Sequence, residues 1–159
     1  MLRRLFLAAL LSVFPIFCQK YTGPRPPKPD IAYLVHADNL LATEVSEAKE
    51  QDGKDALTYV IGGATSPART PLASPIFLIK ADKIDPTKLQ LFKLESKDGQ
   101  REIEFPKKKR KNAPRPVILT VTKVSSDNIY RVEVDETLDP GEYSLTPEGS
   151  NQVFCFQVF

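Results

Sequence analysis

The sequence predicts an all-β fold in which two antiparallel sheets pack as a β-sandwich, with a closed β-barrel as the alternative. Three observations indicate this fold. Short segments of alternating apolar and polar residues recur from residue 31 to residue 159, and turn-forming Asp-Gly, Asp-Asn and Glu-Gly-Ser-Asn sequences separate them. No helical pattern of about 10–15 residues alternates with them, which excludes an α/β fold.

About ten strands are expected, at Ile31–Val35, Leu40–Lys49, Ala56–Ile61, Ile76–Ala81, Lys88–Glu95, Arg101–Phe105, Val117–Ser125, Ile129–Asp135, Glu142–Thr146 and Gln152–Val158. Asp52-Gly53 and Asp98-Gly99 are typical of type I′ hairpin turns. Residues 117–119 and 153–156 are apolar on both faces, which predicts that their strands lie in the interior of a sheet. Residues 39–51 also show helical spacing, but the Asp-Gly turn that follows favours a strand.

Residues 1–18 have the layout of a secretory signal peptide, with Arg3 and Arg4 before an apolar run that ends at Cys18. The run is shorter than the roughly 20 residues that span a bilayer as a helix. A twin-arginine signal, lipidation of Cys18 and an uncleaved anchor are the alternatives. We therefore expect an N-terminal signal-peptide helix and an exported protein, periplasmic or extracellular, that is membrane-tethered if the signal is retained.

A proline-rich linker, residues 19–30, is expected to join the signal to a single β-sandwich domain, residues 31–159. Its four prolines favour an extended polyproline II conformation. The whole chain has 22 basic and 20 acidic residues. Because two of the basic residues lie in the signal, the cleaved chain would be formally neutral, which argues against binding to nucleic acid.

The sequence LDPGEY, which ends at Tyr143, resembles the tyrosine corner of immunoglobulin-like and fibronectin-like sandwiches. Pro140 and Gly141 would form the turn, and the Tyr143 hydroxyl would bond to the backbone a few residues upstream. With GSNQVFCF, residues 149–156, this segment is similar to the C-terminal end of uncharacterised exported bacterial proteins. The resemblance implies an immunoglobulin-like sandwich and export, and it implies no known activity.

One proline-bounded loop carries a cluster of basic residues: Lys107, Lys108, Lys109, Arg110, Lys111 and Arg115. Without them the cleaved chain would hold 14 basic and 20 acidic residues, so we expect one cationic loop on an acidic body. The run matches a nuclear localisation signal, which an exported chain would not use. The functional interpretation is docking on an anionic surface, lipid or polysaccharide. A solvated loop that protects a sheet edge is the alternative.

Residues 62–75 form a long connection of small residues in which Pro67, Pro71 and Pro75 recur every four positions. We expect a strap that crosses between the two sheets. The alternative is a binding loop in which Arg69 holds a carboxylate or phosphate through two parallel hydrogen bonds.

The sequence shows no catalytic constellation. One His and two Cys cannot supply a Cys/His zinc site, and neither a glycine-rich phosphate loop nor a Gly-x-Ser-x-Gly elbow is present, so no metal or cofactor is expected. Cys155 is expected to be a buried, unreactive thiol. The predicted function is an exported cell-envelope binding or assembly module without catalytic activity, whose partner is an envelope protein or an anionic surface. An envelope hydrolase using His36 and loop carboxylates, or a purely structural domain, is the alternative.

Overall fold

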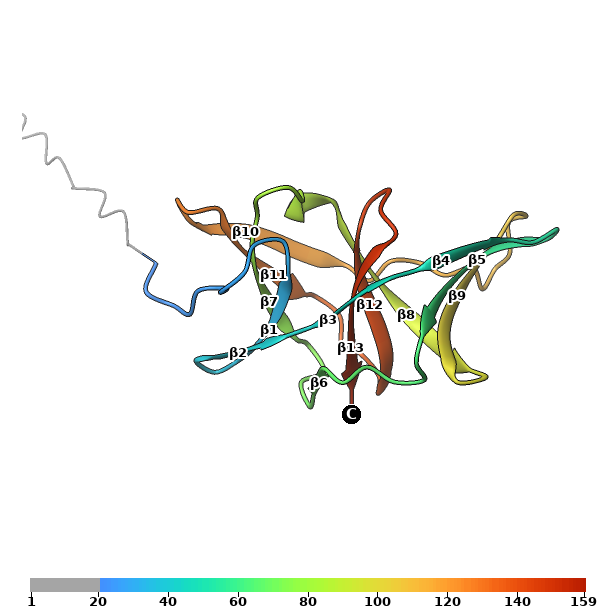
Figure 1. Ribbon diagram of the computed structural model, residues 1–159, viewed down its shortest axis with the longest axis horizontal. Coiled ribbons are helices and arrows are strands. Elements are labelled where there is room, and N and C mark those ends of the chain that lie inside the picture. The colour runs from blue at the N-terminus through green and yellow to red at the C-terminus, as the bar shows by residue number, and fades with distance from the viewer. Residues whose placement is uncertain (1–20) are drawn as a thin grey trace, which may run out of the picture.

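The computed structural model describes residues 21–159, which form thirteen strands and one 3₁₀ turn, with no α-helix (Figure 1). The predicted all-β fold is confirmed, and the predicted signal helix lies outside the described residues. The elements are β1 (Ala32–His36), β2 (Asn39–Ala42), β3 (Glu44–Glu47), β4 (Lys49–Asp52), β5 (Ala56–Gly62), β6 (Arg69–Thr70), β7 (Ile76–Lys80), η1 (Pro86–Lys88), β8 (Leu89–Lys97), β9 (Gln100–Pro106), β10 (Leu119–Ser125), β11 (Ile129–Val134), β12 (Gly141–Pro147) and β13 (Gln152–Val158).

The strands form two sheets. One has five strands in the order β10-β11-β7-β1-β2, and the other has the order β3-β13-β12-β8-β9-β5-β4, with β6 also paired to β13. All pairs are antiparallel except that of β6 with β13. The second sheet curls into a half-barrel. Its two terminal strands, β3 and β4, are separated along the chain by Ala48 alone, so the curl brings the two ends of the strand order together.

The main hydrophobic core lies between the two sheets. The five-stranded sheet contributes Phe77 and Ile79, and β12 and β13 contribute Tyr143, Leu145, Phe154 and Phe156. The ring centroids of Phe77 and Phe156 lie 5.1 Å apart in an edge-to-face contact. The alternate residues of β13, Val153 and Cys155, face a second buried cluster inside the half-barrel. Both faces of β12 and β13 are therefore covered, as the apolar run 153–156 predicted.

The predicted strand Leu40–Lys49 is wrong as a single element, and so is the helical alternative. The chain instead forms β2, β3 and β4, and it passes from one sheet to the other at Thr43. This residue is buried, and its backbone N–H and its hydroxyl both donate to the carbonyl oxygen of Ala32, at 3.1 and 2.8 Å. A crossing of this kind leaves the apolar pattern unchanged, because the inward-facing residues remain apolar in both sheets.

The prediction that residues 117–119 lie in the interior of a sheet is also wrong. β10 begins at Leu119 and forms an edge of the five-stranded sheet, and Ile118 is 59% exposed. Val117 belongs to the other side of the molecule, where its N–H donates to the carbonyl oxygen of Leu91 in β8 at 2.8 Å. The apolar run is thus a second crossing between the sheets.

The expected turn geometry holds at one Asp-Gly pair and fails at the other. Asp98 and Gly99 have φ values of 52° and 78°, as a type I′ turn requires, and Lys97 pairs with Gln100 across it. The β4–β5 hairpin instead has a loop of residues 53–55 without a positive φ. The strap of residues 63–75 joins β5 of the half-barrel to β7 of the five-stranded sheet, as expected of a crossing connection.

The described part of the proline-rich linker is attached to the domain. Pro26 is buried, and Arg25 forms an ion pair with Asp127 in the β10–β11 turn. The carboxylate of Asp30 accepts hydrogen bonds from the backbone N–H groups of residues 82, 83 and 84. Residues 25–30 are therefore positioned by the five-stranded sheet.

The Tyr143 hydroxyl donates a 2.8 Å hydrogen bond to the carbonyl oxygen of Asp139, four residues upstream, which is the bond that defines a tyrosine corner. Gly141 between them has a φ of 154°, and a Cβ there would lie 3.1 Å from the Lys93 side chain. A side chain at position 141 would therefore be strained.

Replacing Tyr143 by Phe should lower the free energy of unfolding by about 0.5–1.5 kcal/mol, because the part-buried hydrogen bond to the carbonyl oxygen of Asp139 is lost. Urea unfolding followed by far-UV circular dichroism measures the loss. Tyr130→Phe is the matched control, because no hydrogen bond of the Tyr130 hydroxyl occurs within residues 21–159. Equal losses in the two variants would contradict a specific contribution of the corner.

Candidate functional site

The interior of the half-barrel contains an apolar cavity of about 530 Å³. Because side chains alternate along a strand, each strand contributes every second residue to it. The inward-facing set is Ala48 and Glu50 from the β3–β4 segment, Leu57, Tyr59 and Ile61 from β5, Gln90, Phe92 and Leu94 from β8, Ile103 and Phe105 from β9, Ser144 and Thr146 from β12, and Val153 from β13. We refer to this space as the half-barrel cavity.

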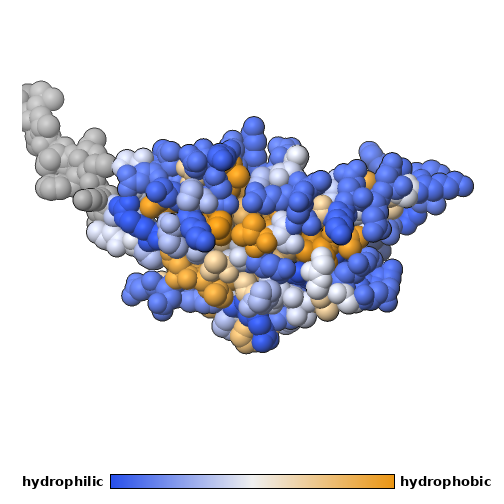
Figure 2. All heavy atoms as spheres, viewed as in Figure 1, coloured by the Kyte–Doolittle hydropathy of each residue, from blue (hydrophilic) through white to orange (hydrophobic). Residues whose placement is uncertain are grey.

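Exposure along the strands gives the cavity a closed end and a mouth. Ile61, Leu94 and Ile103 are buried and form its inner part. Tyr59, Phe92 and Phe105 are only partly buried, and Phe105 makes edge-to-face contacts with the other two rings at centroid distances of 6.0 and 5.4 Å. Aromatic rings therefore surround the outer part of the cavity. Figure 2 shows apolar residues gathered in the middle of the molecule between hydrophilic borders.

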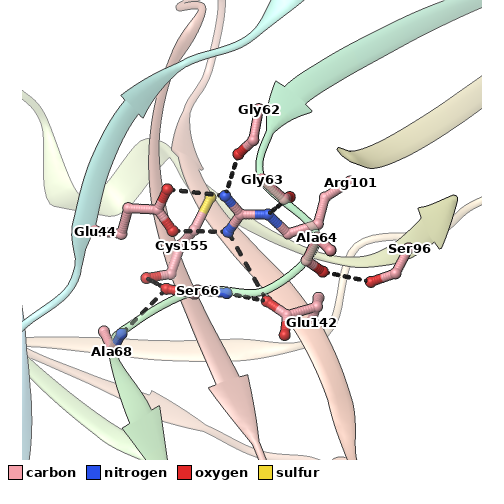
Figure 3. A network of polar contacts seen from close by, with 10 residues as sticks. All are labelled: Glu44, Gly62, Gly63, Ala64, Ser66, Ala68, Ser96, Arg101, Glu142 and Cys155. Carbon is pink, nitrogen blue, oxygen red and sulfur yellow. Dashed lines mark hydrogen bonds and ion pairs between the residues drawn. The ribbon is translucent and has the colours of Figure 1, made fainter. Parts of the chain in front are cut away.

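Arg101 closes the inner end. It precedes Ile103 and Phe105 on the inward face of β9, and its exposed fraction is 0%. Its Nε donates to the carbonyl oxygen of Gly63 at 2.9 Å and its Nη2 to that of Gly62 at 2.7 Å. The two Nη atoms also bind both carboxylate oxygens of Glu44 in β3, at 2.7 and 2.8 Å (Figure 3). One side chain thus joins β9, β3 and the end of β5.

Two further groups complete this network. The Oε2 atom of Glu142, on β12, lies 3.8 Å from Arg101 Nη1 and accepts a 2.9 Å hydrogen bond from the backbone N–H of Ser66 in the strap. The Ser66 hydroxyl donates to the carbonyl oxygen of Cys155 at 3.1 Å. The other carboxyl oxygen of Glu142 is buried and has no hydrogen-bond partner among residues 21–159. The strap is therefore fixed to β12 and β13.

The two carboxyl groups of the network have opposite pKa shifts. Burial opposes ionisation of Glu44, but two hydrogen bonds from Arg101 outweigh it and lower the pKa. Burial raises the pKa of Glu142, and the contacts of this carboxyl with Ser66 and Arg101 only partly offset that effect. Burial also raises the pKa of the Cys155 thiol to about 12, so this fully buried free cysteine is not a thiolate near neutral pH.

The cationic loop lies along the mouth of the cavity. Pro114 and Pro116 line the mouth itself, and Pro114 also lines a neighbouring hollow together with Arg110 and Lys111. The first and last basic residues are paired: Lys107 Nζ lies 2.6 Å from Asp52, and Arg115 binds Glu136 through both Nη atoms. Within residues 21–159 no ion pair involves Lys108, Lys109, Arg110 or Lys111, and all four are exposed.

The other predicted site residues lie elsewhere. The Arg69 guanidinium stacks on the ring of Phe159, 4.5 Å from its centroid, at the β6 end of the molecule and far from the cationic loop (Figure 1). His36 Nε2 lies 3.0 Å from the Thr70 hydroxyl. Within the described residues no hydrogen bond joins His36 to a carboxylate, a serine or a cysteine. The structure therefore separates Arg69 and His36 from the cavity.

Sequence reasoning missed the residues that build the cavity. The sequence held one indication of this site. Arg101 shares a face of β9 with the apolar residues Ile103 and Phe105, and a charged residue on an apolar face indicates a buried charge. The partners Glu44 and Glu142 could not be inferred, because they are 57 residues before and 41 residues after Arg101 in the sequence. The contribution of Pro114 to the mouth could not be inferred either, because it depends on how the loop returns to β8.

Comparison of the chain with protein-family models, with curated proteins and with solved structures found no match. No group of three or more His, Cys, Asp or Glu side chains within residues 21–159 is arranged to hold a metal ion. The described part of the chain also contains no helix with the length and hydrophobicity needed to cross a bilayer.

Replacing Arg101 by Met should destabilise the fold by about 3–5 kcal/mol, because Glu44 and Glu142 would lose their cation in a buried site. Arg101→Lys keeps the charge but cannot form the bidentate bond to both carboxylate oxygens of Glu44, so its loss of stability should be intermediate. Arg115→Met is the matched control, since the Arg115–Glu136 pair is exposed and should contribute little. Urea unfolding midpoints rank the variants, and similar midpoints for Arg101→Met and Arg115→Met would refute the closing role of Arg101.

Replacing Glu142 by Gln should change how stability depends on pH. The folded protein holds the Glu142 proton more tightly than the unfolded chain does, so Glu142 lowers stability as pH rises from about 4.5 through its raised folded pKa. Gln has no such proton. The stability of Glu142→Gln relative to the native protein should therefore increase over this interval, and unfolding curves at a series of pH values measure it. A constant or decreasing difference would show that the Glu142 pKa is not raised.

Proposed function

We propose that the protein is an exported binding module of the cell envelope, without catalytic activity, and that the half-barrel cavity receives an apolar group of its ligand. The observation that carries this proposal is an open, aromatic-rimmed apolar cavity of about 530 Å³, within the roughly 300–1,000 Å³ typical of small-molecule sites. The export part of the proposal is supported by the signal-like residues 1–18.

The partly exposed aromatic rim favours a binding role over a purely structural one. A core of this size could have been filled by larger inward-facing side chains, yet Ala48, Ser144 and Thr146 are small and leave space. Keeping Tyr59 and Phe92 partly exposed costs stability, because apolar surface remains in contact with water. Exposed apolar surface gathered in a concavity with a polar border is characteristic of binding sites.

The chemistry of the individual groups supports binding rather than catalysis. Arg101 has its guanidinium engaged by Glu44 and two backbone carbonyls, Cys155 has a pKa of about 12, and His36 is bonded to Thr70. None of these groups is placed at the cavity mouth with a free lone pair or proton. An immunoglobulin-like origin of the fold belongs to the same proposal, and the hydrogen bond of Tyr143 supports it.

Filling the cavity should abolish binding of an apolar probe. The test uses N-phenyl-1-naphthylamine, a neutral dye whose fluorescence rises in apolar surroundings. Thr146→Phe places a ring in the cavity and should weaken dye binding at least about tenfold, a loss of roughly 1.4 kcal/mol. Thr122→Phe, the same change on an exposed position of β10, is the matched control and should bind the dye as the native protein does. Absence of dye binding by the native protein, or equal weakening in both variants, would refute the proposed site.

A further inference from the structure

We propose that the ligand of the half-barrel cavity is a single-chain amphiphile with an anionic headgroup. Its acyl chain would enter the cavity, and its headgroup would remain at the mouth beside the cationic loop. This inference rests on the proposed function, because it assigns a ligand class to the same cavity.

The size and shape of the cavity fit one acyl chain. A cavity of about 150 Å³ holds one benzene ring, so about 530 Å³ accommodates on the order of twenty carbon atoms. Its lining extends along β5 from Leu57 to Ile61, a length of about 13 Å at the strand rise of ~3.3 Å per residue. The space is therefore longer than a single ring, and it is too small for two long acyl chains.

The inner lining offers a polar guest few partners, because the hydroxyls of Ser144 and Thr146 already bond to each other at 2.9 Å. Ile61, Leu94 and Ile103 offer no hydrogen-bond donors or acceptors through their side chains. The hydroxyl groups of a saccharide would lose their bonds to water there without replacement, at a cost of roughly 1–3 kcal/mol for each group. An anionic polysaccharide could contact the loop but would leave the cavity unused, so a chain of methylene groups is the better match.

The charges around the cavity favour one orientation of the ligand. The lining includes one exposed carboxylate, Glu50 beside Tyr59, which the basic residues of the loop outnumber. The closed end holds two carboxyl groups, Glu44 and Glu142, against the single guanidinium of Arg101, whose donors are already used. An anionic headgroup would find no free donor there. At the mouth, Pro114 lines the cavity three residues after Lys111 and six after Lys108, so the backbone holds the run of four basic residues within about 10 to 22 Å of the mouth. The headgroup is therefore expected at the mouth.

Part of the positive charge is offset locally. Arg110 and Lys111 line a hollow that also contains Glu95, Glu102 and Glu104, on the far side of Pro114 from the cavity. Lys108 and Lys109 are not among the residues that line that hollow. A test of the headgroup contact must therefore neutralise residues 108–111 together.

The experiment is displacement of N-phenyl-1-naphthylamine by lipids of equal chain length, each below its micelle concentration. Lauroyl lysophosphatidylglycerol and laurate carry a net negative headgroup, and lauroyl lysophosphatidylcholine carries a zwitterionic headgroup with no net charge. The anionic compounds should displace the dye at least about tenfold more strongly at low salt, and the difference should shrink as salt rises. A preference between the lysolipid and the free acid then distinguishes a phospholipid from a fatty-acid source.

Two sets of variants separate the chain contact from the headgroup contact. The loop variant carries Lys108→Gln, Lys109→Gln, Arg110→Gln and Lys111→Gln, and its control carries the same change in charge at Lys28, Lys80, Lys83 and Lys123. The loop variant should bind the dye normally and lose the preference for anionic lipids, whereas the control should keep both. Thr146→Phe should lose binding of the dye and of all three lipids.

The outcomes are distinguishable. If the native protein binds the dye but shows no preference for an anionic headgroup, this inference fails and the proposed function stands. If neither the dye nor any lipid binds in the cavity, both fail. If Thr146→Phe still binds vesicles containing phosphatidylglycerol as the native protein does, the loop docks on membrane surfaces independently of the cavity, and the single-chain assignment is wrong.

Discussion

The half-barrel depends on the buried guanidinium of Arg101. Where β5 ends and the strap begins, the backbone carbonyls of Gly62 and Gly63 need hydrogen-bond donors. Arg101 supplies both, and at the same time it binds the carboxylate of Glu44 on β3. An apolar side chain could fill the same volume but could not pair these groups. The charge therefore closes one end of the cavity and defines the other as its mouth.

The same network connects the cavity to the rest of the fold. Glu142 and Cys155 lie on the inward faces of β12 and β13, and the opposite faces of these strands carry the main core. Ser66 attaches the strap to both residues, and the strap continues into the five-stranded sheet. A substitution at Arg101 should therefore disturb β12 and β13, the two strands whose side chains contribute to both hydrophobic cores. The polar cluster therefore lies where the two apolar cores meet.

Local features of the fold could be predicted from the sequence, and long-range ones could not. Alternation along Ile129–Asp135 and the Asp98-Gly99 turn are local, and β11 and the β8–β9 hairpin agree with them. The crossings at Thr43 and Val117 were missed because apolar residues face inward on both sides of a crossing. Alternation also assigns residues to a face without saying what covers that face. Alternation thus places Tyr59, Phe92 and Phe105 on one face of their strands, and only the structure shows that this face opens at a mouth.

The position of the positive charge is fixed by the backbone rather than by ion pairs of the charged residues themselves. At one end of the loop the N–H of Lys107 donates to the carbonyl oxygen of Asp55, and at the other the N–H of Val117 donates to that of Leu91. The two anchors lie on opposite sides of the cavity, on the β4–β5 hairpin and on β8, so the chain between them must pass along the mouth. The side chains of residues 108–111 are exposed and form no ion pair within the described residues, yet the backbone keeps them in this region. Because ordering a cation before binding would cost side-chain entropy, such an arrangement holds the charge near the mouth while leaving each side chain free to adapt to a headgroup.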